Sequence, residues 1–239
     1  VDRFSLLRGI TVTIFFKMNL TDIETPALVL DRERLDGNLV RMHQRINGLG
    51  AGVRPHVKTA KCLDVVRRAA APGVGGITVS TLKEANAFFA EGFTDILYAV
   101  GMVPAKLPQA LALRRQGCQL KIITDSVASS VAIVAFGREH GEVFEVWLEI
   151  DSDGHRSGLK PDEPALLTAA RTLQQGGMRL GGVMTHAGSS YELNTPEALT
   201  AMAAQERDAC MQAAELLRAA GLPCPVVSIG STPTALAAD

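Results

Sequence analysis

The sequence Arg-Pro-His-Val-Lys-Thr occupies residues 54–59 and decides how the rest of the chain is interpreted. Residues two apart on a strand share one face, so we expect Arg54, His56 and Lys58 to project the same way. If that face is the inside of a (β/α)8 barrel, Lys58 lies at the end of the strand where such enzymes place their chemistry. Crowding and partial burial would favour the free amine that a Schiff-base lysine needs. The alternative is a surface lysine that follows a strand.

Apolar strands alternate with helices along the rest of the chain. The strand at 54–58 is the first of seven that are each separated by one helix, which indicates parallel βαβ units buried on both faces. We therefore expect an α/β fold that closes as a (β/α)8 TIM barrel. A doubly wound sheet is the alternative, but no Gly-x-Gly-x-x-Gly follows the first strand. The other predicted strands cover residues 76–79, 95–100, 120–124, 143–150, 180–185 and 225–229, and residues 27–30 are also strand-like.

Polar residues mark the starts of the predicted helices. Asp31 and Ser126 are expected N-caps, and Thr81 with Glu84 fits a capping box. Thr195 before Pro196 is a cap and first-turn pair that opens a long helix. These local signals predict where the connections between strands and helices lie.

The two ends of the chain suggest its domain boundaries. Residues 1–24 are expected to be an N-terminal extension, with Met18 as the true start, and residues 25–239 to be the barrel domain. The sequence stops a few residues into the helix after the seventh predicted strand. We therefore expect a barrel that is truncated before its eighth strand.

Composition limits the classes of function. The 239 residues are 47% hydrophobic and 21% charged, with a net charge of -1, so nucleic acid is not an expected partner and small molecules are. No apolar run approaches the ~20 residues of a membrane helix. The four cysteines include no Cys-x-x-Cys pair, which argues against a zinc knuckle or a disulfide scaffold and favours a cytoplasmic protein.

Polar groups follow several predicted strands and would meet at one mouth of a barrel. Ser80 and Thr81 are more simply a helix cap than a site. The stretch 149–158 lacks the spacing of an EF-hand, but Arg156 between two glycine turns could bind an anionic oxygen. The loop 185–191 is either a site or a hydroxyl-rich helix cap, and 230–234 is either an anion cradle or a structural helix start. A strand-end lysine beside an anion cradle suggests a phosphorylated carbonyl cofactor.

Four motifs in this order resemble one known family. They are Arg-Pro-His-Val-Lys-Thr at 54–59, Asp-Gly-His-Arg-Ser-Gly at 153–158, Thr-His-Ala-Gly-Ser-Ser-Tyr at 185–191 and Gly-Ser-Thr-Pro-Thr at 230–234. The chain is similar from about Thr25 onward to the D-serine dehydratase and D-threonine aldolase family, related to the alanine racemase N-terminal barrel. Ala60 departs from a family pattern in which many relatives have a second His after the lysine.

The resemblance implies roles for six residues around pyridoxal 5'-phosphate. Lys58 would bind the cofactor covalently and act as the catalytic base, Arg156 would contact its phenolic oxygen, and Tyr191 would lie beside its ring. The phosphate would be held by Gly230, Ser231 and Thr232. A divalent metal, zinc or manganese, is expected only with the C-terminal β-domain of the family, which is absent from this sequence.

The reaction implied by the resemblance is β-elimination from a D-3-hydroxy amino acid, D-threo-3-hydroxyaspartate or D-serine, to give a 2-oxo acid and ammonia. We expect a homodimer in the full-length form and an inactive 239-residue chain. One alternative is a D-threonine aldolase, which cleaves the Cα–Cβ bond. Two others are a non-catalytic regulatory protein that binds the same cofactor, and a cofactor-free Schiff-base aldolase.

Overall fold

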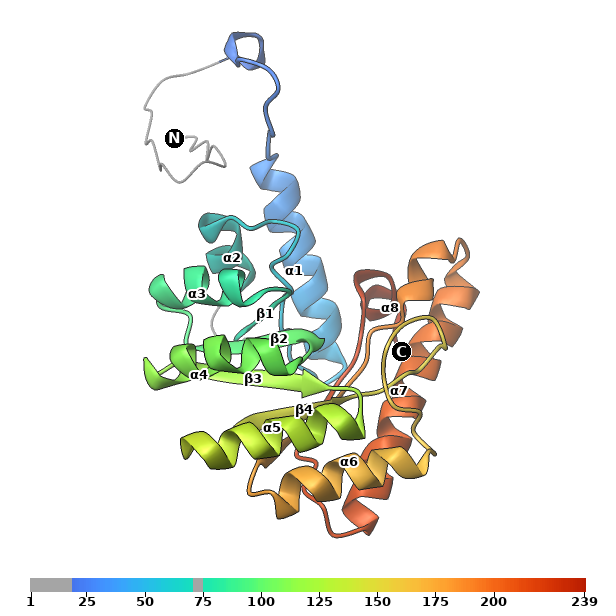
Figure 1. Cartoon of the computed structure of the whole chain (residues 1–239). Coiled ribbons are helices and arrows are strands. Elements are labelled where there is room, and N and C mark those ends of the chain that lie inside the picture. Colours follow the sequence, from blue (N-terminus) through green and yellow to red (C-terminus); the bar gives the residue numbers. More distant parts are fainter. Residues whose placement is uncertain (1–18, 71–74) are drawn as a thin grey trace.

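Six parallel strands form one curled sheet in the computed structural model, which describes residues 19–70 and 75–239 (Figure 1). The strands follow one another in space in the same order as in the sequence. A doubly wound sheet reverses its strand order at a switch point, so this order excludes that alternative. The strands are β1 (Ile77–Val79), β2 (Asp95–Gly101), β3 (Gln119–Thr124), β4 (Glu145–Glu149), β5 (Arg179–Met184) and β6 (Val226–Ser228).

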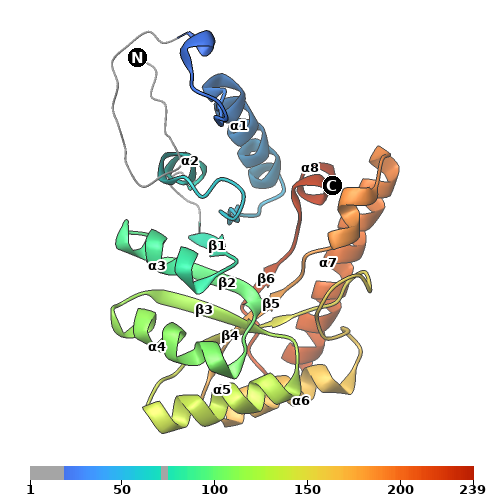
Figure 2. The same ribbon diagram turned by 45° about the horizontal axis from the view of Figure 1, so that its top comes forward.

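Helices connect successive strands and cover the outer face of the sheet (Figure 2). The helices are α1 (Arg32–Gly48), α2 (Leu63–Ala69), α3 (Leu82–Ala90), α4 (Leu107–Arg115), α5 (Val127–His140), α6 (Pro164–Gln175), α7 (Pro196–Ala219) and α8 (Thr232–Ala237). Short 3₁₀ turns lie at η1 (Leu20–Asp22), η2 (Pro104–Lys106) and η3 (Gly188–Glu192). No helix among these is both long and apolar enough to cross a membrane.

The predicted helix starts are confirmed. The side chains of Asp31, Thr81, Ser126 and Thr195 each accept a hydrogen bond from the backbone amide three residues further on. Thr81 also forms the predicted capping box with Glu84. These bonds satisfy amides that have no partner within the helix, which is why local sequence was enough to place them.

Both faces of the sheet are buried, as the continuous hydrophobicity of the strands predicted. Side chains alternate along each strand, so one set packs under the helices and the other lines the concave face. Buried residues of the outer set include Tyr98, Ile122, Val146 and Leu180. A separate apolar cluster of Leu97, Ile123, Trp147 and Met184 fills the concave face.

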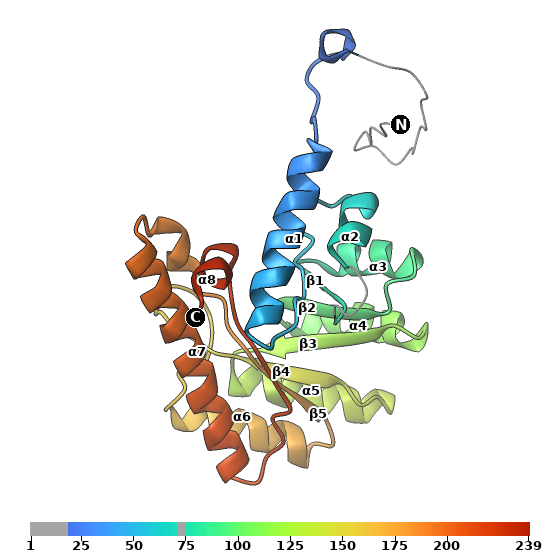
Figure 3. The ribbon, with the colours of Figure 1, turned by 180° about the vertical axis from the view of Figure 1, so that it is seen from behind.

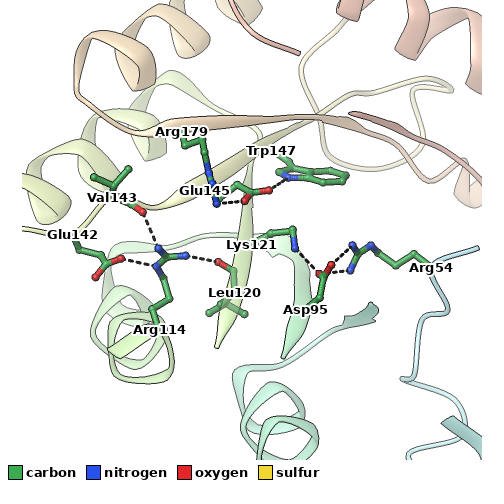
Figure 4. A network of polar contacts seen from close by, with 10 residues as sticks. All are labelled: Arg54, Asp95, Arg114, Leu120, Lys121, Glu142, Val143, Glu145, Trp147 and Arg179. Carbon is green, nitrogen blue, oxygen red and sulfur yellow. Dashed lines mark hydrogen bonds and ion pairs between the residues drawn. The ribbon is translucent and has the colours of Figure 1, made fainter. Parts of the chain in front are cut away.

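Charged side chains form a network across the strands at their amino-terminal ends (Figure 4). Asp95, which starts β2, binds the guanidinium of Arg54 at 2.8 Å and the amine of Lys121 in β3. Glu145, which starts β4, accepts bonds from Trp147 and from Arg179. Burial alone would raise the pKa of Asp95, but the hydrogen bonds from Arg54 and Lys121 hold it below its usual value. Arg54 therefore serves this network and does not lead toward Lys58.

Two strand predictions need correction. The stretch 54–58 makes a single parallel bridge, from His56 to Thr78, and the chain turns at 57–60. Residues 27–30 form no strand, and Leu28 is 83% exposed. An apolar strand needs a neighbour to pair with, and the described residues offer none beside this segment. Because 54–58 is not a full strand, the seventh predicted strand, at 225–229, is observed as the sixth, β6. The expected truncation before an eighth strand stays a prediction.

The first and last helices of the described chain lie side by side (Figure 3). The guanidinium of Arg45 near the end of α1 donates to the carbonyl of Ala238 just beyond α8. Helix α1 precedes β1 and α8 follows β6, so this contact bridges the two ends of the curled sheet.

Candidate functional site

The carboxyl ends of the strands bring the four sequence motifs to one edge of the sheet. Parallel strands place these ends together, so the segments after His56, β1, β4, β5 and β6 form a common mouth. Burial lowers the pKa of both His56 and His186, and the charges of Lys58 and Arg156 lower both further, as expected for side chains that share one mouth. The structure therefore brings together residues that lie up to 130 positions apart, from His56 to His186.

His56 is held as a neutral imidazole with a defined proton position. Burial is the largest cause that lowers its pKa to about 4, and the charge of Lys58 is the next. The backbone amide of Lys58 donates to Nδ1 at 3.2 Å, so Nδ1 carries no proton. The proton is therefore on Nε2, which donates to the Ser80 hydroxyl at 3.2 Å. Thr81 is only a helix cap, as the simpler interpretation held, but Ser80 orients a histidine of the mouth.

Lys58 lies exposed in the turn directly after His56. Its amine makes no hydrogen bond or ion pair to another residue in the described ranges, whereas Lys61 nearby pairs with Glu84 at 3.1 Å. The expected partial burial of Lys58 is therefore wrong, because the chain turns outward after the bridge at His56. What remains is an accessible amine at the mouth, beside two uncharged imidazoles.

His186 follows β5 and is also held in one orientation. Its Nδ1 lies 3.3 Å from the carbonyl oxygen of Gly230, which can only accept, so Nδ1 carries the proton. Burial lowers the pKa of His186, and the charges of Arg156 and Lys58 lower it further. The ring of Tyr191, a predicted site residue, lies 6.0 Å from the His186 ring and is 61% exposed.

Arg156 is an exposed residue of the loop after β4. No described residue accepts a hydrogen bond from it. A Cβ on Gly188 would lie 2.8 Å from its Cδ, so the missing side chain at Gly188 leaves room for Arg156. Glu149, at the end of β4, is 8% exposed, and burial followed by the charge of Asp125 raises its pKa. Its Oε2 atom has no hydrogen-bond partner among the described residues.

Hydrogen bonds join the loops after β4 and β5 into one unit. The Thr185 hydroxyl donates to the carbonyl of Ile150 at 2.7 Å. Asp153 accepts bonds from both the amide and the hydroxyl of Ser189, at 3.2 Å and 2.6 Å. These bonds hold the pKa of Asp153 below its usual value although burial opposes that shift. The loop that carries Arg156 is thus fixed to the loop that carries His186.

The segment 230–234 offers fewer free amides than predicted. Ser231 caps α8, and its own amide donates to the Thr234 hydroxyl at 2.9 Å, so this amide is not available to a ligand. Pro233 has no amide hydrogen. The amides of Gly230 and Thr232 remain without an acceptor among the described residues, and Gly230 has a φ of 117°, which favours glycine. The Ser231 hydroxyl contacts Ser190 at 2.8 Å and so connects this segment to the Tyr191 loop.

These groups fit a phosphorylated aldehyde cofactor. Lys58 offers an amine and Arg156 a guanidinium, neither bonded to another of the residues that the structure describes, and Gly230 and Thr232 offer two amides for an anion. Gly230 also leaves open space, since a Cβ there would meet only Ala235, at 3.9 Å. No cluster of three or more His, Cys, Asp or Glu in the described ranges could hold a metal ion.

Sequence reasoning missed two buried acids, Glu149 and Glu206. Glu149 was within a motif but was not singled out. Glu206 lies in the middle of α7. The sequence pattern that could have revealed it is a single acid among the small apolar residues of one helix face. The other buried residues of that helix are Ala203, Cys210, Ala213, Ala214 and Leu217.

Comparison with known proteins gives consistent matches over most of the chain. The family model of the alanine racemase N-terminal domain matches residues 30–239. D-threo-3-hydroxyaspartate dehydratase from Delftia sp. (strain HT23) is 66% identical over 221 residues, which are 92% of this chain and 58% of the dehydratase. Its solved structure has a TM-score of 0.89 over 91% of this chain and 57% of that one. A cysteine variant of that dehydratase has been solved in a metal-free form.

Two more distant relatives extend the comparison. D-serine dehydratase from Dictyostelium discoideum and D-threonine aldolase from Arthrobacter sp. are each 28% identical over 90% of this chain, which covers 58% and 57% of them. The chain therefore spans less than two thirds of the length of each of these relatives.

Proposed function

The chain belongs to the alanine racemase N-terminal domain family, and from that membership we propose that it binds pyridoxal 5'-phosphate and acts in the dehydration of a D-3-hydroxy amino acid to a 2-oxo acid and ammonia. The observation that carries the proposal is that the Lys58 amine, which has no partner within 19–70 and 75–239, meets Arg156 and two neutral histidines at one mouth. The 66% identity to D-threo-3-hydroxyaspartate dehydratase favours that substrate over D-serine. It also favours dehydration over aldol cleavage, because the aldolase relative is only 28% identical.

Five residues of the mouth have a proposed part in this function. Pyridoxal 5'-phosphate, when bound, makes the proton on Cα of an amino acid more acidic. The amine of Lys58 would hold the cofactor covalently, and the same Nζ atom lies where it could accept the Cα proton of a substrate. Arg156 binds an anionic oxygen of the cofactor, and the amides of Gly230 and Thr232 bind its phosphate. Tyr191, whose ring lies 6.0 Å from that of His186, would lie beside the cofactor ring.

The neutral state of the two histidines supports this assignment. Charged imidazoles beside Lys58 and Arg156 would place four cations at the mouth and would disfavour a substrate ammonium group. With His56 and His186 uncharged, only Lys58 and Arg156 of these four groups carry a positive charge. Loss of hydroxide needs a Lewis acid, and we propose a divalent metal for that part, to which we assign none of the described residues.

The proposal is tested by locating the cofactor. Borohydride reduction in the presence of pyridoxal 5'-phosphate, followed by peptide mass mapping, should place the pyridoxyl group on Lys58. Lys61 is the matched control, because it lies three residues away and its amine is paired with Glu84. Label on Lys61 or Lys83 in place of Lys58 would contradict the assignment.

Substrate class is tested by protection of Lys58. A substrate amine competes with Lys58 for the cofactor, so D-threo-3-hydroxyaspartate should reduce the labelling of Lys58 at lower concentration than D-serine or D-threonine. The L-enantiomers serve as controls and should protect weakly. Product analysis then separates the two reactions, since dehydration releases a 2-oxo acid and aldol cleavage releases glycine.

A further inference from the structure

Glu206 is a buried acid in the middle of α7. It is 1% exposed, on the face of the helix that packs against β5 and β6. Its Oε1 atom accepts a hydrogen bond from the backbone amide of Ala187 at 2.6 Å. A bond of this length between a carboxylate and an amide is a strong, charge-assisted one. Glu206 therefore fixes the backbone directly after His186.

Packing alone does not account for an acid at this position. The neighbouring buried positions of α7 hold Ala203, Cys210 and Ala213, all small and apolar. The Oε2 atom of Glu206 has no hydrogen-bond partner among the described residues. Burying a carboxylate with half of its hydrogen-bonding capacity unused costs free energy that an apolar side chain at 206 would avoid. The negative charge is thus the property that needs an explanation.

The charges around His186 provide that explanation. Arg156 and Lys58 are the cations whose charges act on it, and the nearby His56 is neutral. Glu206 is the anion that acts on it: burial and the two cations lower the pKa of His186, whereas the hydrogen bond to Gly230 and, to a smaller extent, the charge of Glu206 raise it. Cys210, one turn along α7, carries no charge because burial raises the pKa of its thiol to about 12. Glu206 therefore supplies a negative charge to the mouth from α7, the helix that packs against β5.

We propose that Glu206 is a positioning residue, which fixes the His186–Gly188 backbone through the Ala187 amide and balances the charges of Lys58 and Arg156 around His186. Its neighbour Gln205 donates to the carbonyl of Ser152 at 2.6 Å, so α7 holds the loops after both β4 and β5. The inference rests on the proposed function only in that the mouth is taken as the cofactor site. The contacts of Glu206 themselves do not involve the cofactor.

The test separates the charge of Glu206 from its hydrogen bond. In Glu206→Gln the side-chain oxygen can still accept from Ala187, but the charge is lost. The pKa of His186, followed by the NMR signal of its Cε1–H group in the cofactor-free chain, should fall by about half a unit or more, a threefold or greater loss of proton affinity. Hydrogen exchange at the Ala187 amide should stay close to that of the wild type. Glu215→Gln removes the same charge from an exposed position of α7 and should change neither quantity.

A second variant tests the hydrogen bond and covers the case in which Glu206→Gln does not fold. Glu206→Asp keeps the charge but shortens the side chain, so the pKa of His186 should stay within about 0.3 of the wild-type value while the Ala187 amide exchanges at least tenfold faster. An unchanged pKa of His186 in Glu206→Gln, or unchanged exchange at Ala187 in Glu206→Asp, would overturn the proposal. Neither measurement uses the cofactor, so failure here leaves the Lys58 assignment intact, and failure of Lys58 labelling leaves this result intact.

Discussion

A Cβ atom on Gly188 would lie 2.8 Å from Cδ of Arg156, closer than carbon atoms approach without one of them moving. The two residues come from different loops, after β5 and after β4. The missing side chain at Gly188 therefore decides where the Arg156 guanidinium lies, and the two motifs depend on each other although they are about 30 residues apart.

Gly188→Ala should weaken cofactor binding by displacing Arg156. The backbone at Gly188 is not in the left-handed region, so the effect comes from the contact and not from backbone strain. We expect an affinity for pyridoxal 5'-phosphate about tenfold lower, which is about 1.4 kcal/mol, measured by absorbance titration. Gly37→Ala makes the same chemical change in α1 with no atom within 4 Å, and should leave binding unchanged. Equal affinities in the two variants would contradict the prediction.

Gly230→Val should weaken binding of the phosphate more than Thr232→Ser does. Gly230 has a φ of 117°, which a β-branched residue adopts only at a cost of about 1–3 kcal/mol. We expect at least a tenfold loss of cofactor affinity in Gly230→Val and less than a twofold change in Thr232→Ser, which keeps its amide. Gly50→Val introduces a similar strain at a φ of 72° away from the mouth. If Gly50→Val loses as much affinity as Gly230→Val, general destabilisation and not the phosphate contact is responsible.

His56 should make the chain less stable in mild acid. The pKa of His56 falls from 6.5 to about 4 on folding, so between these pH values the unfolded chain binds more protons than the folded one. The free energy of unfolding is therefore highest above pH 6.5 and decreases as the pH falls toward 4, by about 2 kcal/mol after solvent screening. Urea unfolding of His56→Gln should show a smaller decrease over this range than the wild type. The same decrease in both proteins would disprove the assignment to His56.

Asp95→Asn should destabilise the fold without affecting the mouth. The change removes the anion that Arg54 and Lys121 share, and these cations are only 18% and 12% exposed. Leaving them unpaired should cost about 2–3 kcal/mol in the free energy of unfolding. Asp36→Asn removes a carboxylate that pairs with Arg68 at 3.0 Å on the surface and should cost less than about 1 kcal/mol. Chemical denaturation of both variants makes the comparison.

Local sequence signals predicted much of the fold. Each helix cap depends on atoms within three residues of itself, so Asp31, Thr81, Ser126 and Thr195 were found without knowledge of the tertiary structure. The strands β2 to β5 each have a run of buried residues, most of them apolar, which is a strong signal. The parallel order of the sheet then followed from the alternation of strands and helices.

Other features depend on contacts that the local sequence does not encode. The apolar residues 27–30 predict a strand, but a strand needs a partner, which local sequence does not provide. The orientation of Arg54 is set by Asp95, 41 positions away, and not by the alternation that was expected to point it along with Lys58. The amide of Ser231 was counted toward an anion cradle, but the Thr234 hydroxyl already occupies it.

The contact between α1 and α8 has a consequence for the order in which the molecule folds. Arg45 and the carbonyl of Ala238 are separated by 193 positions, so their contact closes nearly the whole described chain into a loop. The entropy lost on closing a loop rises with its length, whereas β2, β3 and β4 pair with near neighbours. We therefore expect α1 and α8 to join after the central strands have paired and to separate first on unfolding. In hydrogen exchange, their amides should open together at a rate well above that of β3.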